Sequence, residues 1–397
     1  MKILLITSQF HPPRNTGSAN SSSLIYKGLK KRGDEVDLLV FDEKSMAPKY
    51  EKANLREFYR KNDFLTITNE LSKIKDGKYD IIHQYGGGLN FELLPLFSRN
   101  FKVTKIVTTL NGIWPACWSA YGINYDRKSK KCCRFPENLY CAMKKRKTII
   151  KWKSFLEYFY RYFQRVCVKQ YDRYFAQSEA IKHLFSKAGF NKSKFTIIPN
   201  FFDPILHKDI KDTKVKSKDK IVVLYVGVLN THKGVHNLVK AFKNIRNQNV
   251  ELQIMGDGKK RKELEKSSIK DDRIKFLGLI PYRSNEFIKK YKQADIFVHP
   301  GLWPEPFNRT ILEASISKNA MIVSDVGAPP EVLKNQALIY PPHDVETLTN
   351  HLKYLIDNPK KRRKMAENVY DYVIKKYSLK SAIDKLENEY RKLISRN

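Results

Sequence analysis

The chain has 397 residues, of which 42% are hydrophobic, and its 75 Lys and Arg outnumber its 41 Asp and Glu, which gives a net charge of +34. The length predicts two or three domains, and the apolar content suffices for ordinary globular cores. The longest apolar runs have only the length of strands, which excludes a transmembrane helix among them. The charge attracts nucleic acid, anionic membrane surfaces or anionic substrates, so we take it as a sign of a polyanionic neighbour.

The N-terminal stretch Met1–Thr7 is basic and then apolar. It lacks a long apolar region and a small-residue cleavage site, so it predicts a buried first strand rather than a signal peptide. We therefore expect the protein to stay in the cytoplasm.

Short apolar strands alternate with amphipathic helical stretches along most of the chain. We expect strands at 2–8, 35–41, 80–85, 105–110, 174–178 and 195–199 in the first half, and at 221–227, 250–256, 274–278, 296–300, 320–325 and 337–342 in the second. Many lack a clean polar alternation, as parallel strands covered on both faces do. The pattern predicts an α/β protein with one doubly wound, Rossmann-like sheet in each half.

The domain boundaries follow from this pattern and from a polar, Lys- and Asp-rich break near the middle of the chain. We predict a first domain over 1–200, a linker over 201–220, a second domain over 221–377 and a terminal helix over 378–397. Two such domains face a deep cleft, where ligands bind at the carboxyl ends of the strands.

Three polar positions follow strands of the first domain. The stretch 14–18 includes Gly17 and opens a helix, His83 lies near the end of the strand at 80–85, and Asn111 lies just after the strand at 105–110. From the residues alone, the stretch at 14–18 fits a functional loop and a flexible surface loop equally. His83 fits a core histidine at least as well as a site residue.

Two further features lie between 113 and 173. Four cysteines fall within 25 residues, namely Cys117, Cys132, Cys133 and Cys141. This clustering suggests a metal more than disulfides, but a clean C-x-x-C pair is missing, so zinc and a plain loop both stay open. Residues 143–173 form a basic helical pattern whose second, aromatic stripe fits an anionic membrane surface and a packed core equally.

The second domain opens with a strand and then Gly227, Val228 and, further on, Lys233 and Gly234. A glycine turn between strand and helix lets the backbone approach a phosphate, and Lys233 adds a positive charge. The alternative is a structural turn with a solvated lysine.

The stretch 304–314 carries two carboxylates, Glu305 and Glu313. Flanking prolines stiffen the loop around Glu305, Asn308 is a good N-cap, and a helix is predicted to begin at Arg309. The helix N-terminus between the two carboxylates suits a phosphate, so together they can grip one elongated ligand. The alternative is an acidic loop before an ordinary amphipathic helix.

These motifs resemble the retaining glycosyltransferases of family 4, two-domain enzymes of the GT-B fold. The resemblance implies that the first domain is the acceptor side, that the second domain binds the nucleotide sugar, and that the terminal helix at 378–397 crosses back to the first domain. In that family two glutamates separated by seven residues bind the sugar nucleotide, and the matching residues here are Glu305, Pro306, Phe307, Leu312, Glu313 and Ala314. Three positions depart from the family. Asn308 replaces a glycine, and Asn111 replaces a histidine that contacts the donor sugar in the family. Val228 replaces an arginine, and Arg309 is a candidate to supply the missing positive charge.

The resemblance also implies roles. Glu305 would position the donor sugar, Glu313 would hold the ribose, and Lys233 would neutralise the diphosphate. The donor site would further include Gly227, Phe307, Asn308 and Arg309, and the acceptor or phosphate side would include Gly17, His83 and Asn111. The chain contains no Asp-x-Asp motif, which agrees with an enzyme that needs neither a divalent metal nor another cofactor.

We therefore expect a retaining hexosyltransferase that moves a sugar from a nucleotide-diphosphate sugar to a glycan or lipid-linked acceptor, in surface polysaccharide or lipopolysaccharide synthesis. The charge suggests a peripheral contact with the inner face of the cytoplasmic membrane. Two alternatives stay open: a sugar-nucleotide epimerase of the same fold, and a polyanion- or nucleic-acid-binding protein. The chain shows no nucleic-acid-binding motif, so we expect no nucleic-acid partner.

Overall fold

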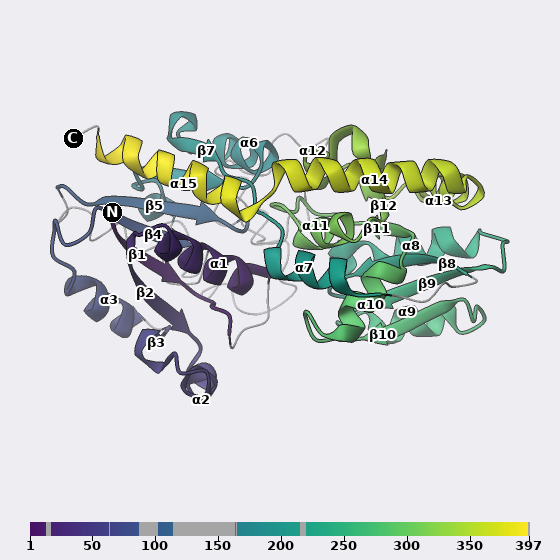
Figure 1. The fold of residues 1–397 in the computed structure, drawn as a ribbon, viewed down its shortest axis with the longest axis horizontal. Coiled ribbons are helices and arrows are strands. Elements are labelled where there is room, and N and C mark those ends of the chain that lie inside the picture. Colours follow the sequence, from purple (N-terminus) through teal and green to yellow (C-terminus); the bar gives the residue numbers. More distant parts are fainter. Residues whose placement is uncertain are drawn as a thin grey trace, which may run out of the picture. The chain divides into compact units, whose positions relative to one another are not determined.

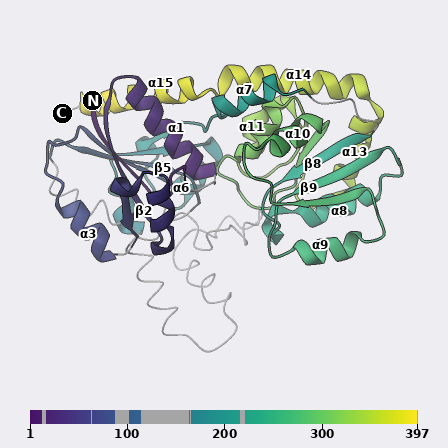
Figure 2. The ribbon, with the colours of Figure 1, turned by 60° about the horizontal axis from the view of Figure 1, so that its bottom comes forward.

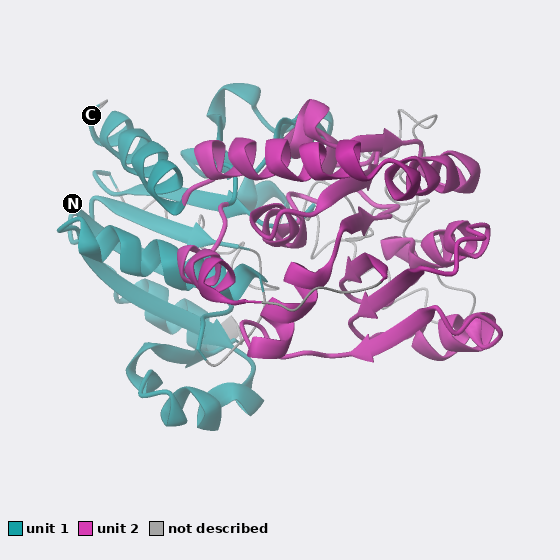
Figure 3. Ribbon diagram, turned by 45° about the vertical axis from the view of Figure 1, so that its right-hand side comes forward, with its two compact units in different colours: residues 1–200, 379–397 teal, residues 201–378 magenta. Residues whose placement is uncertain are grey.

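The computed structural model describes residues 1–12, 17–62, 64–86, 102–113, 163, 165–214 and 220–395. The chain forms two compact units, the first of Met1–Asn200 with Leu379–Asn397 and the second of Phe201–Ser378 (Figure 3). Residues 13–16, the four clustered cysteines and most of the basic pattern at 143–173 lie outside the described residues, so the predictions for them stay predictions.

Unit 1 contains a seven-stranded parallel sheet in the order β3-β2-β1-β4-β5-β6-β7. Its strands are β1 (Lys2–Thr7), β2 (Glu35–Asp42), β3 (Tyr59–Lys61), β4 (Ile81–Tyr85), β5 (Lys105–Leu110), β6 (Arg173–Ala176) and β7 (Phe195–Ile197). The central strands β1, β4 and β5 are almost wholly buried, which explains their continuous apolar runs.

The described helices of unit 1 are α1 (Gly17–Lys31), α2 (Ala47–Lys52), α3 (Phe64–Ser72), α6 (Glu179–Lys187) and α15 (Leu379–Ile394), with short 3-10 helices at Lys44–Met46, Arg56–Phe58 and Lys192–Lys194. Helix α15 packs against α1 (Figure 1). The approach is close, because a Cβ at Gly28 would lie 2.0 Å from Ile383 Cδ1. Arg32 also pairs with Asp384 and, at 3.0 Å, with Glu387.

Unit 2 contains a six-stranded parallel sheet in the order β10-β9-β8-β11-β12-β13. Its strands are β8 (Ile221–Val226), β9 (Val250–Met255), β10 (Ile274–Gly278), β11 (Ile296–His299), β12 (Ala320–Ser324) and β13 (Leu338–Tyr340). The strand order reverses between the neighbours β8 and β11. In open α/β sheets, ligands bind at the carboxyl ends of the strands at such a reversal.

The helices of unit 2 are α7 (Pro204–Asp212), α8 (Val235–Lys243), α9 (Arg261–Ser268), α10 (Asn285–Gln293), α11 (Arg309–Ile316), α12 (Pro329–Leu333), α13 (Val345–Asp357) and α14 (Pro359–Lys376), with 3-10 helices at Thr231–Lys233 and Lys334–Gln336. They cover both faces of the sheet. One core lies under α8, α9 and α13, and the other lies under α7, α10, α11, α12 and α14. Figure 2 shows β8 and β9 between α8 and α9 on one side and α10 and α11 on the other.

All twelve predicted strands are present, with ends that differ by at most a few residues, and the α/β class is confirmed. The short edge strand β3 was not predicted, because three residues, Tyr59–Lys61, give no readable period. The segment 201–220, predicted as a linker, contains helix α7. Asp203 caps that helix through the amides of Ile205 and Leu206, and Pro204 occupies its first position.

Candidate active site

The residues predicted for a phosphate and a sugar meet at the strand reversal of unit 2. Lys233 lies after β8, and Glu305 lies after β11, the strand paired with β8. The Lys233 ammonium forms an ion pair with Glu305 Oε1, and both side chains are largely buried, with exposures of 18% and 9%. The structure therefore brings together two residues that are 72 positions apart in sequence.

Trp303 completes this pair. Its indole Nε1 donates a hydrogen bond of 2.8 Å to the same Glu305 oxygen, and its ring lies 5.1 Å from the Lys233 Nζ. In the described part of the chain, the other carboxylate oxygen, Oε2, accepts no hydrogen bond from protein. One oxygen of Glu305 thus fixes the orientation of the side chain through Lys233 and Trp303.

Interlocked backbones hold the pair in place. A Cβ at Gly234 would lie 1.8 Å from the Pro300 carbonyl oxygen, and a Cβ at Gly327 would lie 2.5 Å from the Glu305 nitrogen. Both glycines have a φ near +70°, which residues with a Cβ rarely adopt. The loops after β8, β11 and β12 therefore pack backbone to backbone, which gives Lys233 and Glu305 a rigid frame.

Gly227 is a second point of close backbone approach. Its φ is +154°, and a Cβ at Gly227 would lie 2.8 Å from the Tyr225 hydroxyl oxygen, while a Cβ on the neighbouring Gly256 would lie 2.0 Å from the Gly227 carbonyl oxygen. Gly227 is thus required for packing whether or not it also contacts a ligand. Val228, which stands where the family has arginine, is 50% exposed.

Asn308 shows why its position can hold either glycine or asparagine. Its φ is +71°, a region that asparagine tolerates better than most residues. Its side-chain oxygen accepts a hydrogen bond of 3.0 Å from the Thr310 amide, which confirms the predicted N-cap of α11. Its amide nitrogen lies 2.9 Å from Nδ1 of the buried His299.

Glu313 lies in the second turn of α11, in different surroundings. It is only 6% exposed, and Tyr291 donates a hydrogen bond of 2.8 Å to its Oε2. The positive charge of Arg309 acts to lower the pKa of Glu313. The Arg309 guanidinium itself donates a hydrogen bond of 3.5 Å to the Tyr282 hydroxyl. Arg309, predicted to supply a missing charge, thus belongs to the surroundings of Glu313.

The two carboxylates differ in pKa. Burial alone would raise the pKa of Glu305, but the Lys233 ammonium, with help from His299 and Trp303, brings it below its usual value of 4.5. Burial raises the pKa of Glu313, and Arg309 and Tyr291 only partly oppose that rise. Burial also lowers the pKa of His299 to about 4, so this ring is neutral at pH 7.

Phe307, predicted in the donor site, lies in the core instead. It is 1% exposed, and its ring packs edge-on against Tyr377 with centroids 5.6 Å apart. Its side chain anchors the loop that carries Glu305 and does not face a ligand, because an aromatic ring between two prolines and a helix has apolar surface to bury.

In unit 1, the structure separates the predicted residues. His83 is fully buried, with Nδ1 2.6 Å from the Tyr390 hydroxyl and Nε2 2.8 Å from Thr109 Oγ1. Burial lowers its pKa to about 3. Both ring nitrogens are satisfied inside the protein, so His83 is a core histidine that joins β4 to α15, as the alternative interpretation held.

Asn111 does lie beside the helix that begins at Gly17. Its Nδ2 donates to Ser18 Oγ at 3.2 Å, and its Oδ1 accepts a hydrogen bond of 2.5 Å from Gln177. Asn111 remains partly accessible at the carboxyl end of β5. These two candidates of unit 1 therefore form one polar cluster without His83.

Trp303, His299 and Tyr291 were not predicted as part of the site. Trp303 stands two residues before Glu305, and this closeness in sequence was a usable signal. His299 and Tyr291 resemble ordinary strand and helix residues, and only the tertiary fold places them against Asn308 and Glu313.

The described residues contain no group of three or more His, Cys, Asp or Glu side chains placed to hold a metal ion. None of the helices in this part of the chain combines the length and apolar character that crossing a bilayer requires.

Two family models match the chain over most of its length. Residues 16–205 match "Glycosyltransferase Family 4", and residues 207–372 match "Glycosyl transferases group 1". An uncharacterized glycosyltransferase of Methanocaldococcus jannaschii is 25% identical over 98% of both chains. A protein from the cps region of Klebsiella pneumoniae is 24% identical over 95% of this chain and 98% of its own.

A solved structure shares the fold. HepE of Anabaena in complex with UDP superposes with a TM-score of 0.71 and 18% identity, over 99% of this chain and 100% of its own. Together with the two parallel sheets, this likeness identifies the α/β fold as GT-B. The chain therefore belongs to the group 1 and family 4 glycosyltransferases.

Proposed function

We propose that the protein transfers a sugar from a nucleotide-diphosphate sugar to a glycan or lipid-linked acceptor, with retention of configuration, in surface polysaccharide synthesis. The observation that carries this proposal is the buried Lys233–Glu305 pair at the strand reversal of unit 2. The solved complexes of HepE with UDP and with UDP-glucose support a nucleotide-sugar donor. The relative from a cps region supports the link to polysaccharide.

Lys233 is suited to stabilise a leaving diphosphate. An ammonium has three N–H donors, and Glu305 takes one of them, so two remain for phosphate oxygens. The amides at the N-terminus of α11 supply further partial positive charge close to Glu305 in sequence. As the anomeric carbon gains positive character and the diphosphate leaves, stabilisation of that negative charge lowers the barrier.

The two carboxylates divide the remaining work. Glu305, which Lys233 and Trp303 orient through one oxygen, offers the other oxygen to a hydroxyl of the donor sugar. Glu313, which Tyr291 orients in the same way, offers its free oxygen to the ribose. Arg309 adds a second positive charge at the start of α11.

Retention requires the acceptor to attack the face from which the diphosphate leaves. We propose that the leaving phosphate takes the acceptor proton on that face, with no covalent intermediate on a side chain. In this scheme the charge of the diphosphate is balanced by Lys233, Arg309 and the α11 amides, so transfer is expected to continue in EDTA. The anomeric configuration of the product, measured by NMR, tests retention.

The first test is a thermal-shift panel of UDP-, GDP- and ADP-sugars with wild type, Glu313→Ala and the control Glu367→Ala, an exposed position on α14. A ligand at 100 times its Kd stabilises a protein by about 2.7 kcal/mol, which is readily measured. We expect a shift with one nucleotide in wild type and control, and its loss in Glu313→Ala. Absence of a shift with every nucleotide would overturn the proposal, and donor hydrolysis without transfer would favour an epimerase.

A further inference from the structure

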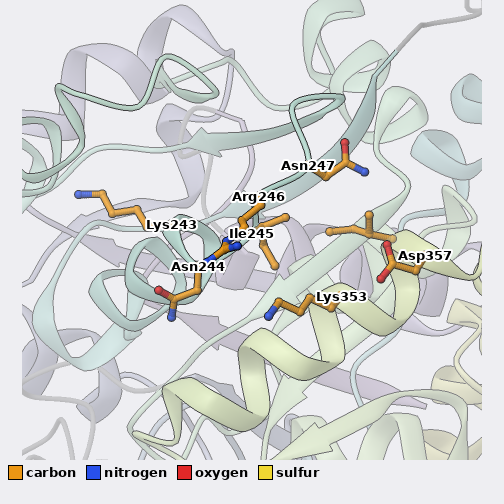
Figure 4. A pocket seen from close by; sticks show the side chains of 8 residues that line it. Lys243, Asn244, Ile245, Arg246, Asn247, Lys353 and Asp357 are labelled. Atoms are coloured by element: carbon orange, nitrogen blue, oxygen red, sulfur yellow. The ribbon is translucent and has the colours of Figure 1, made fainter.

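A second concave surface of unit 2 lies outside the candidate active site. It is an open groove of about 670 Å³, a volume typical of ligand sites. It is lined by Lys243, Asn244, Ile245, Arg246, Asn247, Lys353, Ile356 and Asp357 (Figure 4). None of these residues contributes to the donor site described above.

The groove is built from the end of α8, the segment that leads to β9, and the last turns of α13. Arg273 braces that segment, because its Nη1 donates hydrogen bonds of 2.6 Å to the Ile245 carbonyl and 2.9 Å to the Asn247 carbonyl. Arg273 is itself fixed by Asp271 at 2.7 Å and by the ring of Phe242. The wall of the groove is therefore held in shape by buried contacts.

Its lining is basic, with Lys243, Arg246 and Lys353 against Asp357. Lys243 already donates a hydrogen bond to the Ser267 carbonyl. For Arg246 and Lys353, the structure gives no ion pair within the residues it describes. Two cations of the groove are thus available to an anionic ligand.

The positive surface continues into α14. Residues 360–364 are five consecutive Lys and Arg, and the next acidic residue after Asp357 is Glu367. These cations occupy the first turns of the helix, which contain no acidic residue, although the positive end of a helix dipole disfavours cations. The dipole of α14 therefore does not account for them, and of the five only Arg362 is given a contact with the end of a helix, α13, among the described residues.

Helix-end stabilisation accounts for part of the groove only. Lys243 is in the last turn of α8, where a cation is favourable. Arg246 lies beyond that helix, and the run at 360–364 lies at the wrong end of its own. Arg362 does have a structural contact, since its guanidinium donates hydrogen bonds of 2.7 and 3.2 Å to the Leu355 and Ile356 carbonyls at the end of α13. Among the described residues, no ion pair accounts for the positive charge of Arg246 and Lys353.

We propose that this basic groove binds an anionic glycan, one that bears carboxylate or phosphate groups, separately from the donor site. Arg246 and Lys353 would bind the acidic groups, and the amides of Asn244 and Asn247 can exchange hydrogen bonds with sugar hydroxyls. The lining contains no aromatic side chain on which bases could stack, and it is concave, which favours a glycan over nucleic acid or a membrane. The choice of a glycan rests on the proposed function, whereas the binding of an anion does not.

The test compares wild type, Arg246→Glu/Lys353→Glu and the control Lys208→Glu/Lys289→Glu, which makes the same change in charge at exposed positions on α7 and α10. Binding is measured by fluorescence anisotropy with labelled oligogalacturonate, a phosphate-bearing mannan oligosaccharide and a neutral maltooligosaccharide. A single-stranded oligonucleotide and phosphatidylserine vesicles serve as the other polyanions. Thermal shift with the nucleotide panel checks the donor site in each variant.

We expect at least one anionic oligosaccharide to bind, the neutral one not to bind, and the groove variant to lose about tenfold or more in affinity, the size of one charge-assisted hydrogen bond. The control should lose much less, and the response to nucleotides should not change in either variant. Equal losses of affinity in the groove variant and the control would overturn the inference, because binding would then depend on the overall positive charge of the protein and not on the groove. Groove-dependent binding of the oligonucleotide or the vesicles alone would overturn the choice of a glycan. If no nucleotide sugar gives a thermal shift while the groove still binds the glycan, the result would count against the proposed function and not against the groove.

Discussion

Glu305 and Glu313 lie eight positions apart and are equally buried, each 6% exposed, yet the structure gives them opposite electrostatic surroundings. Glu305 contacts an ammonium and an indole N–H, and the pKa of its carboxyl is lowered. Glu313 contacts a tyrosine hydroxyl, and the pKa of its carboxyl is raised. Burial is common to both, so the neighbours decide the direction in which the pKa of each carboxyl shifts.

The proposed function assigns two kinds of ligand contact to this one short motif, and the difference in surroundings fits that division. Glu305 is fixed as a charged group beside a cation that can meet a diphosphate. Glu313 is a weaker acid whose contact with Tyr291 orients it without a full opposite charge. We therefore expect changes at Glu305 and Lys233 to affect the chemical step, and changes at Glu313 to affect donor binding.

The largest expected effect is on the transfer rate. Lys233→Met should lower kcat roughly 10²–10³-fold, because removal of one preorganised donor to a developing negative charge has that effect in other enzymes. Glu313→Gln should instead raise the KM for the donor more than it lowers kcat. Steady-state kinetics with the donor that the thermal-shift panel identifies measure both. Lys240→Met, an exposed position on α8, is the matched control, and a similar kcat loss in it would contradict the role of Lys233.

The next effect is on stability. Glu305→Gln should lower the free energy of unfolding at pH 7 by about 3 kcal/mol, because Lys233 would be left largely buried without its counter-charge. Urea unfolding measures it, and a double variant with Lys233→Met should recover part of the loss. Glu313→Gln should be much milder, because glutamine can still accept the hydrogen bond from Tyr291.

The pH dependence of the same pair of variants sharpens the comparison. Since the folded pKa of Glu305 is below 4.5, its stabilisation is present above pH 4.5 and is lost as the pH falls, so the deficit of Glu305→Gln should shrink in acid. The folded pKa of Glu313 is above 4.5, so its contribution to the stability of the fold is fully present below pH 4.5. That contribution is lost as the pH rises through the folded pKa. The free energy of unfolding of Glu313→Gln should therefore increase relative to that of wild type as the pH rises. If the stability of the two variants changed with pH in the same way, the opposite pKa shifts of Glu305 and Glu313 would be contradicted.

The smallest effect concerns the cap between the two carboxylates. Asn308→Gly should change stability by only a few tenths of a kcal/mol, because glycine accepts both the N-cap and the positive φ. Asn308→Ala should lower it by about 1–2 kcal/mol, since alanine loses the cap and strains the backbone. Thermal unfolding distinguishes the two, and equal losses would mean that the contact with His299 matters more than the backbone.

The sequence by itself determined the strands other than β3, the α/β class, the N-cap at Asn308 and the spacing of the two glutamates. These features are local, because strand periodicity, capping and motif spacing depend on residues close together in the chain. It also identified Lys233, Glu305 and Glu313 as the residues to examine.

Only the tertiary structure decided the contacts between distant segments. It joined Lys233 to Glu305, placed Trp303 and His299 beside them, put Phe307 in the core, and buried His83 between Thr109 and Tyr390. Burial and pairing depend on which segments the packed sheet brings together, and no local pattern encodes that. The opposite pKa shifts of Glu305 and Glu313 are likewise a property of the fold, because they depend on burial and on contacts with Lys233 and Tyr291, which lie 72 and 22 positions away in the chain.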